Sequence, residues 1–132
     1  MLKILRPGLQ TTIQDAGRFG WYHIGMPPSG AMDQFSFRVG NLLAGNHEDA
    51  AALETTFQGP DLEAAADITV AVTGAPLELR LNGEPAPMWV ALLLKAGDKL
   101  QCGQALAGVR SYICVAGGID VPQLLEIGRA HV

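Results

Sequence analysis

The stretch ITVAVTGAPLELRLNG, residues 68–83, decides the fold class. Isoleucine, valine or leucine occupies every second position of 68–72 and of 77–81, which is the period of a half-buried β-strand. Gly74 ends the first run, and the second run continues into Asn82-Gly83, the strongest short-range hairpin pattern. The stretch therefore predicts two β-strands and a hairpin turn.

The rest of the chain extends this pattern around one helix. We expect further strands over residues 1–6, 9–14, 53–57, 88–94 and 109–115, with the apolar run at 88–94 buried on both faces. A helix is predicted near Asp33–Ala44, with Asp33 as its N-cap and Gly45 and Asn46 at its end. Its predicted apolar face comprises Met32, Phe35, Val39, Leu42 and Leu43. Short strands at this spacing with one helix predict a mainly β (β-rich α+β) fold, either a barrel or a sandwich.

Composition restricts the classes of protein that the chain can be. Hydrophobic residues make up 48% and charged residues 17%, which is typical of a domain with a real core and not of a disordered segment. The 16 glycines and 8 prolines exceed average usage and indicate many turns. The net charge of -4, without a basic run, disfavours nucleic acid as a partner.

No membrane or secretory segment is expected. The longest apolar run, Pro87–Leu94, is too short for a membrane helix, and no apolar signal-peptide core follows Lys3 and Arg6. We therefore expect a cytoplasmic protein. Cys102 and Cys114 have neither metal-ligand nor CxxC spacing, so we expect buried, reduced thiols and no metal site.

A glycine- and proline-rich segment, residues 15–30, is the first candidate for a binding site, because loops of this length in compact domains are usually functional. Arg18 offers a bidentate fork for a carboxylate, and His23 can exchange a proton near neutral pH. Glycine backbone N–H groups can approach an oxyanion closely. Together with Glu54 and residues 112–120, the segment predicts a site for a small anionic ligand.

Each of these residues also has a plain structural interpretation. Arg18 can pair with Asp15 at the surface, and His23 can be an ordinary loop histidine. Asp33 can act as a helix cap alone, and Gly117-Gly118 can form a tight turn. The chain contains no phosphate-binding loop, dinucleotide fingerprint, nucleophile elbow, zinc motif or biotin-attachment context, so ATP or biotin would have to come from elsewhere.

Five strings in order along the chain resemble the biotin-dependent carboxyltransferase family, which includes one of the 5-oxoprolinase subunits, the KipA proteins and allophanate hydrolase subunit 2. They are LRPG with TTIQDAGR (5–8 and 11–18), GMPPSGAMD (25–33), NLLAGN (41–46), AALE (51–54) and VAGGIDVP (115–122). The resemblance implies a cyclophilin-like β-barrel and a role as one subunit of an ATP-dependent 5-oxoprolinase or a biotin-dependent carboxyltransferase acting on a urea- or amide-type substrate. ATP and biotin would be supplied through a companion carboxyltransferase subunit of the KipI-like type and through a lactam-utilisation or biotin carboxylase subunit.

Chemistry of this kind needs an anion-binding, glycine-lined pocket, and we expect the polar residues singled out above to line it. We expect Arg18, His23, Ser29 and Asp33 to be the catalytic residues, with Arg18 for a substrate carboxylate, His23 for proton transfer and Ser29 with the Gly30 backbone as donors. The expected substrate-binding set is Gly30, Glu54, Tyr112, Gly117 and Gly118. The alternative is a regulatory protein-binding module of the KipA type, which would act on a kinase-inhibiting partner.

The end of the chain departs from the family pattern. After VAGGIDVP the family continues with a different string and about as much chain again, whereas this chain ends in EIGRAHV, residues 126–132. Those seven residues can be back-translated into a common sequencing-adapter read. We therefore expect residues 1–125 to be the N-terminal part of such a domain and residues 126–132 to be a non-native tail.

Overall fold

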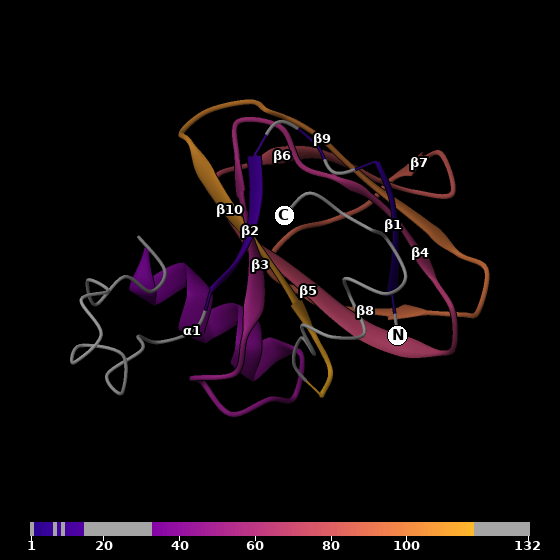
Figure 1. Ribbon diagram of the computed structural model, residues 1–132, viewed down its shortest axis with the longest axis horizontal. Coiled ribbons are helices and arrows are strands. Elements are labelled where there is room, and N and C mark those ends of the chain that lie inside the picture. Colours follow the sequence, from indigo (N-terminus) through magenta and orange to yellow (C-terminus); the bar gives the residue numbers. More distant parts are fainter. Residues whose placement is uncertain (1, 7, 9, 15–32, 118–132) are drawn as a thin grey trace, which may run out of the picture.

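The computed structural model describes residues 2–6, 8, 10–14 and 33–117, which contain one helix and two five-stranded antiparallel sheets (Figure 1). The first sheet has the strand order β1-β4-β9-β6-β7 and the second has the order β2-β3-β10-β5-β8. The elements in chain order are β1 (Leu2–Arg6), β2 (Gln10–Gln14), α1 (Gln34–Leu43), β3 (Ala52–Thr56), β4 (Asp61–Ala64), β5 (Ile68–Gly74), β6 (Leu77–Leu81), β7 (Glu84–Pro85), β8 (Ala91–Leu94), β9 (Lys99–Ala105) and β10 (Arg110–Val115). The predicted mainly β fold with one helix is confirmed.

The two sheets are the two halves of one sheet that folds over on itself. Each strand of the first sheet is joined by a short bend to the strand in the same position of the second sheet, as β1 is to β2 and β9 is to β10. The pairing register also continues through the bends, because Arg6 pairs with Asp61 in the first sheet and Gln10 with Thr56 in the second. Five long, bent strands therefore pass through both layers.

The bends form a single line of turns, which we call the crease. The bends after β1, β3, β5, β7 and β9 each contain or adjoin a residue with positive φ, and these residues are Gly8 (78°), Phe57 (63°), Gly74 (96°), Trp89 (62°) and Gly108 (74°). Neighbouring bends bond to one another: Phe57 N–H donates to the Val109 carbonyl at 2.8 Å, and Ala75 N–H to the Arg110 carbonyl at 2.9 Å. Three of these five residues are glycines, which adopt positive φ without strain.

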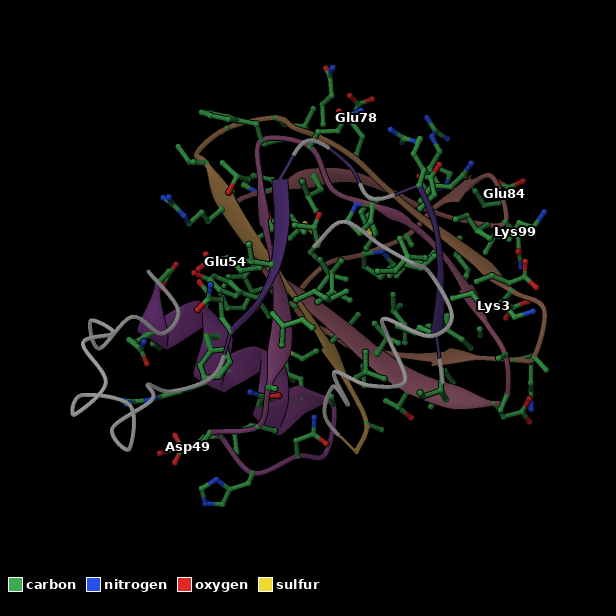
Figure 2. The ribbon with its side chains drawn as sticks, viewed as in Figure 1. Lys3, Asp49, Glu54, Glu78, Glu84 and Lys99 are labelled. Atoms are coloured by element: carbon green, nitrogen blue, oxygen red, sulfur yellow. The ribbon has the colours of Figure 1, made fainter. Side chains whose placement is uncertain are left out.

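The main core lies between the two halves. It is built from the inward-facing side chains of eight strands: Leu2, Ile4, Leu53, Leu62, Ala64, Val70, Val72, Leu77, Leu79, Leu94, Leu100, Cys102, Ile113 and Val115. The outer face of the first sheet is charged, with Lys3 paired to Glu63 and Glu63 paired to Lys99. Lys3 and Lys99 lie on the far side of the molecule from α1 (Figure 2).

The outer face of the second sheet carries α1 as a third layer (Figure 1). Phe37 and Ala44 pack there on Ala52, Ala71 and Cys114. The helix approaches the sheet closely at Gly40, where an added Cβ would lie 2.7 Å from the Cys114 sulfur and 2.8 Å from Thr73 Oγ1. Only glycine fits at this position without a shift.

The helix has the predicted bounds and cap, but the predicted apolar face is only partly correct: Leu43 packs on the core under the helix, whereas Phe35 and Leu42 do not, and Met32 lies outside the described residues. Its buried residues are Ser36, Phe37, Gly40 and Asn41. Phe35 and Leu42 are 70% and 58% exposed. The cause is the close packing at Gly40, which places small and polar side chains against the sheet, while Asn41 Nδ2 bonds to the Ala50 carbonyl at 2.8 Å.

Two strand predictions also need correction. The run at 88–94 forms a strand only over β8, which lies at one edge of the second sheet, and Leu93 on it is 75% exposed, so it is not buried on both faces. Strands β4 and β9 were not predicted: β4 has four residues, and β9 carries its alternating Leu100 and Cys102 among polar residues and a glycine. The Asn82-Gly83 hairpin is confirmed, with φ values of 52° and 85° that are typical of its turn type.

Both cysteines are free and buried, as predicted. Cys102 lies in the core between the two halves, whereas Cys114 lies under the helix. Burial raises the pKa of both thiols, that of Cys114 to about 12. Within the described part of the chain, no helix is long and apolar enough to cross a membrane.

The crease gives a direct test of this fold. Gly74→Ala would add a Cβ 2.7 Å from the Arg110 carbonyl at a φ of +96°, so we expect a loss of about 2–4 kcal/mol in the free energy of unfolding, from left-handed strain and overpacking together. Gly83→Ala is the matched control, because its φ is +85° and nothing lies within 4 Å, so it should lose only about 1 kcal/mol. Urea unfolding measures both, and equal losses would contradict the role given to the crease.

Candidate functional site

Tyr112 joins the second sheet to the start of the helix. Its hydroxyl donates a 2.6 Å hydrogen bond to Glu54 Oε2 and accepts one of 2.8 Å from the Asp33 N–H. Tyr112 and Glu54 are direct partners on β10 and β3, so the strand register places them side by side. Glu54 lies next to α1 in Figure 2. A residue at the helix N-terminus is thus fixed to a buried carboxylate on the sheet.

Asp33 is the N-cap of α1, which confirms its structural prediction. Its Oδ1 accepts from the Ser36 N–H at 3.1 Å and its Oδ2 from the Ser36 hydroxyl at 2.6 Å. The Ser36 carbonyl in turn accepts from the Thr73 hydroxyl at 2.6 Å. The first turn of the helix is therefore held at both its cap and its backbone, and the Asp33 carboxylate has a fixed position.

Arg110 lies beside Glu54, and its Nε is 3.7 Å from Glu54 Oε1. The Glu54 side chain is only 8% exposed, so the guanidinium supplies a nearby positive charge to a carboxylate that is nearly out of water. Arg110 also lines a pocket of about 460 Å³ together with Asp33, Ala75, Gly108 and Val109. The pocket thus lies between the crease and the helix N-terminus.

The electrostatics of Tyr112 suit a positioning role. Burial, and then the hydrogen bond to Glu54, raise the pKa of its hydroxyl well above the usual value. The phenol is therefore neutral at physiological pH and acts as a hydrogen-bond bridge. Its ring packs edge-to-face on Phe37, with centroids 6.2 Å apart, which further fixes the hydroxyl.

The structure brings together Asp33, Glu54 and Tyr112 of the predicted site residues. Gly117 lies elsewhere, near the C-terminal end of α1, where its N–H donates to Asn46 Oδ1 at 2.8 Å in a turn with φ of 89°. Arg18, His23, Ser29, Gly30 and Gly118 lie outside the described residues, as does the predicted boundary at Leu125. The roles assigned to these residues remain predictions. Among the described residues, no group of three or more His, Cys, Asp or Glu side chains could hold a metal ion.

Sequence reasoning missed Arg110. The residue stands two positions before Tyr112, so on a strand the two side chains share one face, and its partner Thr56 stands two positions after Glu54. The period of two along a strand could have placed Arg110 on the same face as the predicted site residues Tyr112 and Glu54. That inference also requires knowing that β3 and β10 are neighbours in the sheet.

Fold and site together define a mainly β domain with one capping helix and a charged pocket where the helix begins. A family model described as "Carboxyltransferase domain, subdomain A and B" matches residues 24–128. The chain belongs to this family. The resemblance noted from the sequence is therefore confirmed.

Individual relatives agree with this assignment. The chain is 43% identical over 125 residues to a 5-oxoprolinase subunit of Escherichia coli (strain K12), covering 95% of this chain and 40% of that protein. It is 40% identical over 124 residues to a urea amidolyase of Lachancea kluyveri, covering 93% of this chain and 7% of that protein. The crystal structure of the Kluyveromyces lactis urea carboxylase superposes with a TM-score of 0.85 at 39% identity, over 90% of this chain and 11% of that one. The chain thus spans less than half the length of these relatives.

The Tyr112 bridge can be tested by stability. Tyr112→Phe keeps the ring but leaves the Asp33 N–H and a Glu54 oxygen without this partner, so we expect a loss of about 1–3 kcal/mol in the free energy of unfolding at pH 7. Glu54→Gln, whose amide oxygen can still accept the Tyr112 hydrogen bond, should lose less. Chemical denaturation of the wild type, Tyr112→Phe and Glu54→Gln measures these free energies. A Tyr112→Phe protein as stable as the wild type would show that the hydrogen bonds of Tyr112 do not stabilise the fold.

The raised pKa of Tyr112 predicts a pH dependence. Below the ordinary tyrosine pKa of about 10 the phenol is protonated in both the folded and the unfolded chain. Above it the unfolded chain loses this proton first, so the folded protein loses stability as the pH rises. Unfolding free energies measured from pH 8 to 11 should fall more steeply in the wild type than in Tyr112→Phe. Parallel curves would show that Tyr112 ionises normally in the folded protein.

Proposed function

We propose that this chain acts as a carboxyltransferase-type subunit of a multi-subunit enzyme that acts on 5-oxoproline or on a urea- or amide-type substrate. The observation that carries the proposal is the cluster of Asp33, Glu54, Tyr112 and Arg110 beside the pocket. The names of the relatives supply the substrate classes, since one is a 5-oxoprolinase subunit and the other a urea amidolyase.

The cluster has the parts that amide chemistry at such a site needs. Opening a lactam or carboxylating an amide moves a proton on or off nitrogen and builds negative charge on an oxygen. Glu54 is nearly buried and is held between Tyr112 and Arg110, so we assign it to positioning the guanidinium. Arg110 and the N–H groups at the start of α1 provide positive potential at the pocket. Asp33 is the carboxylate that lines the pocket, so it is the group we assign to proton transfer, while Tyr112 acts as a positioning residue.

We assign ATP, and biotin in the carboxyl-transfer version, to partner subunits. Arg110 is the one cation among the described residues that line the pocket, and a guanidinium suits a carboxylate. Bound ATP would supply an activated phosphoryl group and carboxybiotin a carboxyl group. A companion carboxyltransferase-type subunit and a lactam-utilisation or biotin carboxylase subunit are the partners that would bring these groups.

The test is turnover by the assembled enzyme. The gene for this chain is expressed with those for its neighbouring subunits, and ATP-dependent formation of glutamate from 5-oxoproline is measured. Asp33→Asn, which keeps an N-cap side chain on α1, should lower the rate by about 10²–10⁴-fold while the complex still assembles. The control is Glu78→Gln, an exposed glutamate on the outer face of the first sheet (Figure 2), which should leave the rate unchanged.

Two results would contradict the proposal. The first is full activity of Asp33→Asn in an assembled complex. The second is the absence of ATP-dependent turnover of 5-oxoproline and of urea-type amides with every candidate partner present.

A further inference from the structure

Arg110 lines the pocket, and the described part of the chain gives its Nε no hydrogen-bond partner. A guanidinium carries five N–H donors and stays charged at every pH of interest. Arg110 Nε is buried and makes no hydrogen bond in the described part of the chain, and the 3.7 Å separation from Glu54 is an ion-pair distance too long for a hydrogen bond. The side chain as a whole is 37% exposed. The buried Nε of Arg110 thus faces Glu54, while the rest of the side chain is partly exposed and Arg110 lines the pocket.

Glu54 holds Arg110 in place without saturating it. One Glu54 oxygen takes the 2.6 Å hydrogen bond from Tyr112, and the other faces the guanidinium. The ion pair compensates for the burial of the Glu54 carboxylate and holds the arginine side chain at its Nε. An arginine whose side chain is held by an ion pair and whose Nε has no hydrogen-bond partner among the described residues is preorganised for a second carboxylate, because little side-chain entropy is lost when that ligand binds.

We propose that this pocket binds a small carboxylic acid through Arg110, and that this contact selects lactam acids such as 5-oxoproline over uncharged amides such as urea. The inference rests on the proposed function and deepens it by naming the substrate class. The pocket volume of about 460 Å³ falls in the range of small-ligand sites and accommodates a single five-membered ring.

Asp33 supplies the complementary end of the pocket. Within the described part of the chain, its two oxygens each accept one bond from Ser36, and a carboxylate oxygen can accept a second. A ligand with a carboxylate at one end and an amide N–H at the other therefore matches the pair of Arg110 and Asp33. Urea offers N–H groups and no anion, so it could use only the Asp33 end.

The same contact chemistry fits two sources of carboxylate. One is the acid group of an organic substrate, and the other is a bicarbonate-derived carboxyl group. Binding is therefore measured with purified protein by ligand-observed NMR and calorimetry, using 5-oxoproline, 2-pyrrolidinone and bicarbonate. 2-Pyrrolidinone is the same lactam ring without the carboxylate, so it isolates the contribution of the acid.

The expected result is saturable binding of 5-oxoproline that is at least about tenfold tighter than that of 2-pyrrolidinone, the effect of one charge-assisted contact. Arg110→Gln should weaken 5-oxoproline binding by about tenfold or more and leave 2-pyrrolidinone unaffected. Arg110→Lys keeps the charge next to Glu54 but lacks the fork, so it should bind with intermediate affinity even if the glutamine variant is unstable. Arg80→Gln is the control, an exposed strand arginine on the first sheet, and should bind as the wild type does.

Three outcomes would overturn the inference: equal binding of the two lactams, unchanged 5-oxoproline binding in both Arg110 variants, or Arg110-dependent binding of bicarbonate alone. The binding assay needs no partner subunit, so it separates the two proposals. Arg110-dependent binding without turnover in any complex leaves the carboxylate site standing and refutes the proposed function. Turnover with unchanged kcat/KM in Arg110→Lys and Arg110→Gln supports the proposed function and refutes the carboxylate site.

Discussion

The rest of the structure depends on one constraint, namely that a single five-stranded antiparallel sheet folds back on itself along one line. Hydrophobic burial drives the folding, because the inward faces of both halves supply the main core. The backbone must then bend in all five neighbouring strands along that line. Each bend contains or adjoins a residue with positive φ, a conformation that is unfavourable for residues other than glycine. The bends also bond to one another, as between Phe57 and Val109, so they form a connected structure.

The crease and the helix together create the site. The pocket takes Ala75, Gly108 and Val109 from two bends and Arg110 from the first position of β10, while Asp33 comes from the cap of α1. The hydrogen bonds of Tyr112 connect these parts through the sheet. A helix placed one turn further along the sheet would lose the bond to Asp33. The close contact at Gly40 and the bond from Thr73 to the Ser36 carbonyl set that placement.

Local patterns in the sequence predict elements well and their packing less well. The alternation at 68–72 and 77–81, the Asn82-Gly83 turn and the Asp33 cap each depend on neighbouring residues, and all are confirmed. The buried face of α1 could not be found from hydrophobicity, because Gly40 and Asn41 face the sheet for reasons of space and hydrogen bonding. Asp33, Glu54 and Tyr112 were singled out from the sequence as site candidates, whereas the importance of Arg110 emerges only when β3 and β10 are known to be neighbours.

Stability and site geometry are coupled through the backbone of Arg110. Its carbonyl accepts the Ala75 N–H and lies where a side chain on Gly74 would be, so the bend after β5 packs directly on the residue that faces the pocket. Its side chain meanwhile shares a buried charge with Glu54, whose other oxygen is bound by Tyr112. We therefore expect a change at the crease to displace the guanidinium, and a change at Glu54 to remove the carboxylate that holds it. The same few contacts that let the sheet fold over also fix where the pocket carries its positive charge.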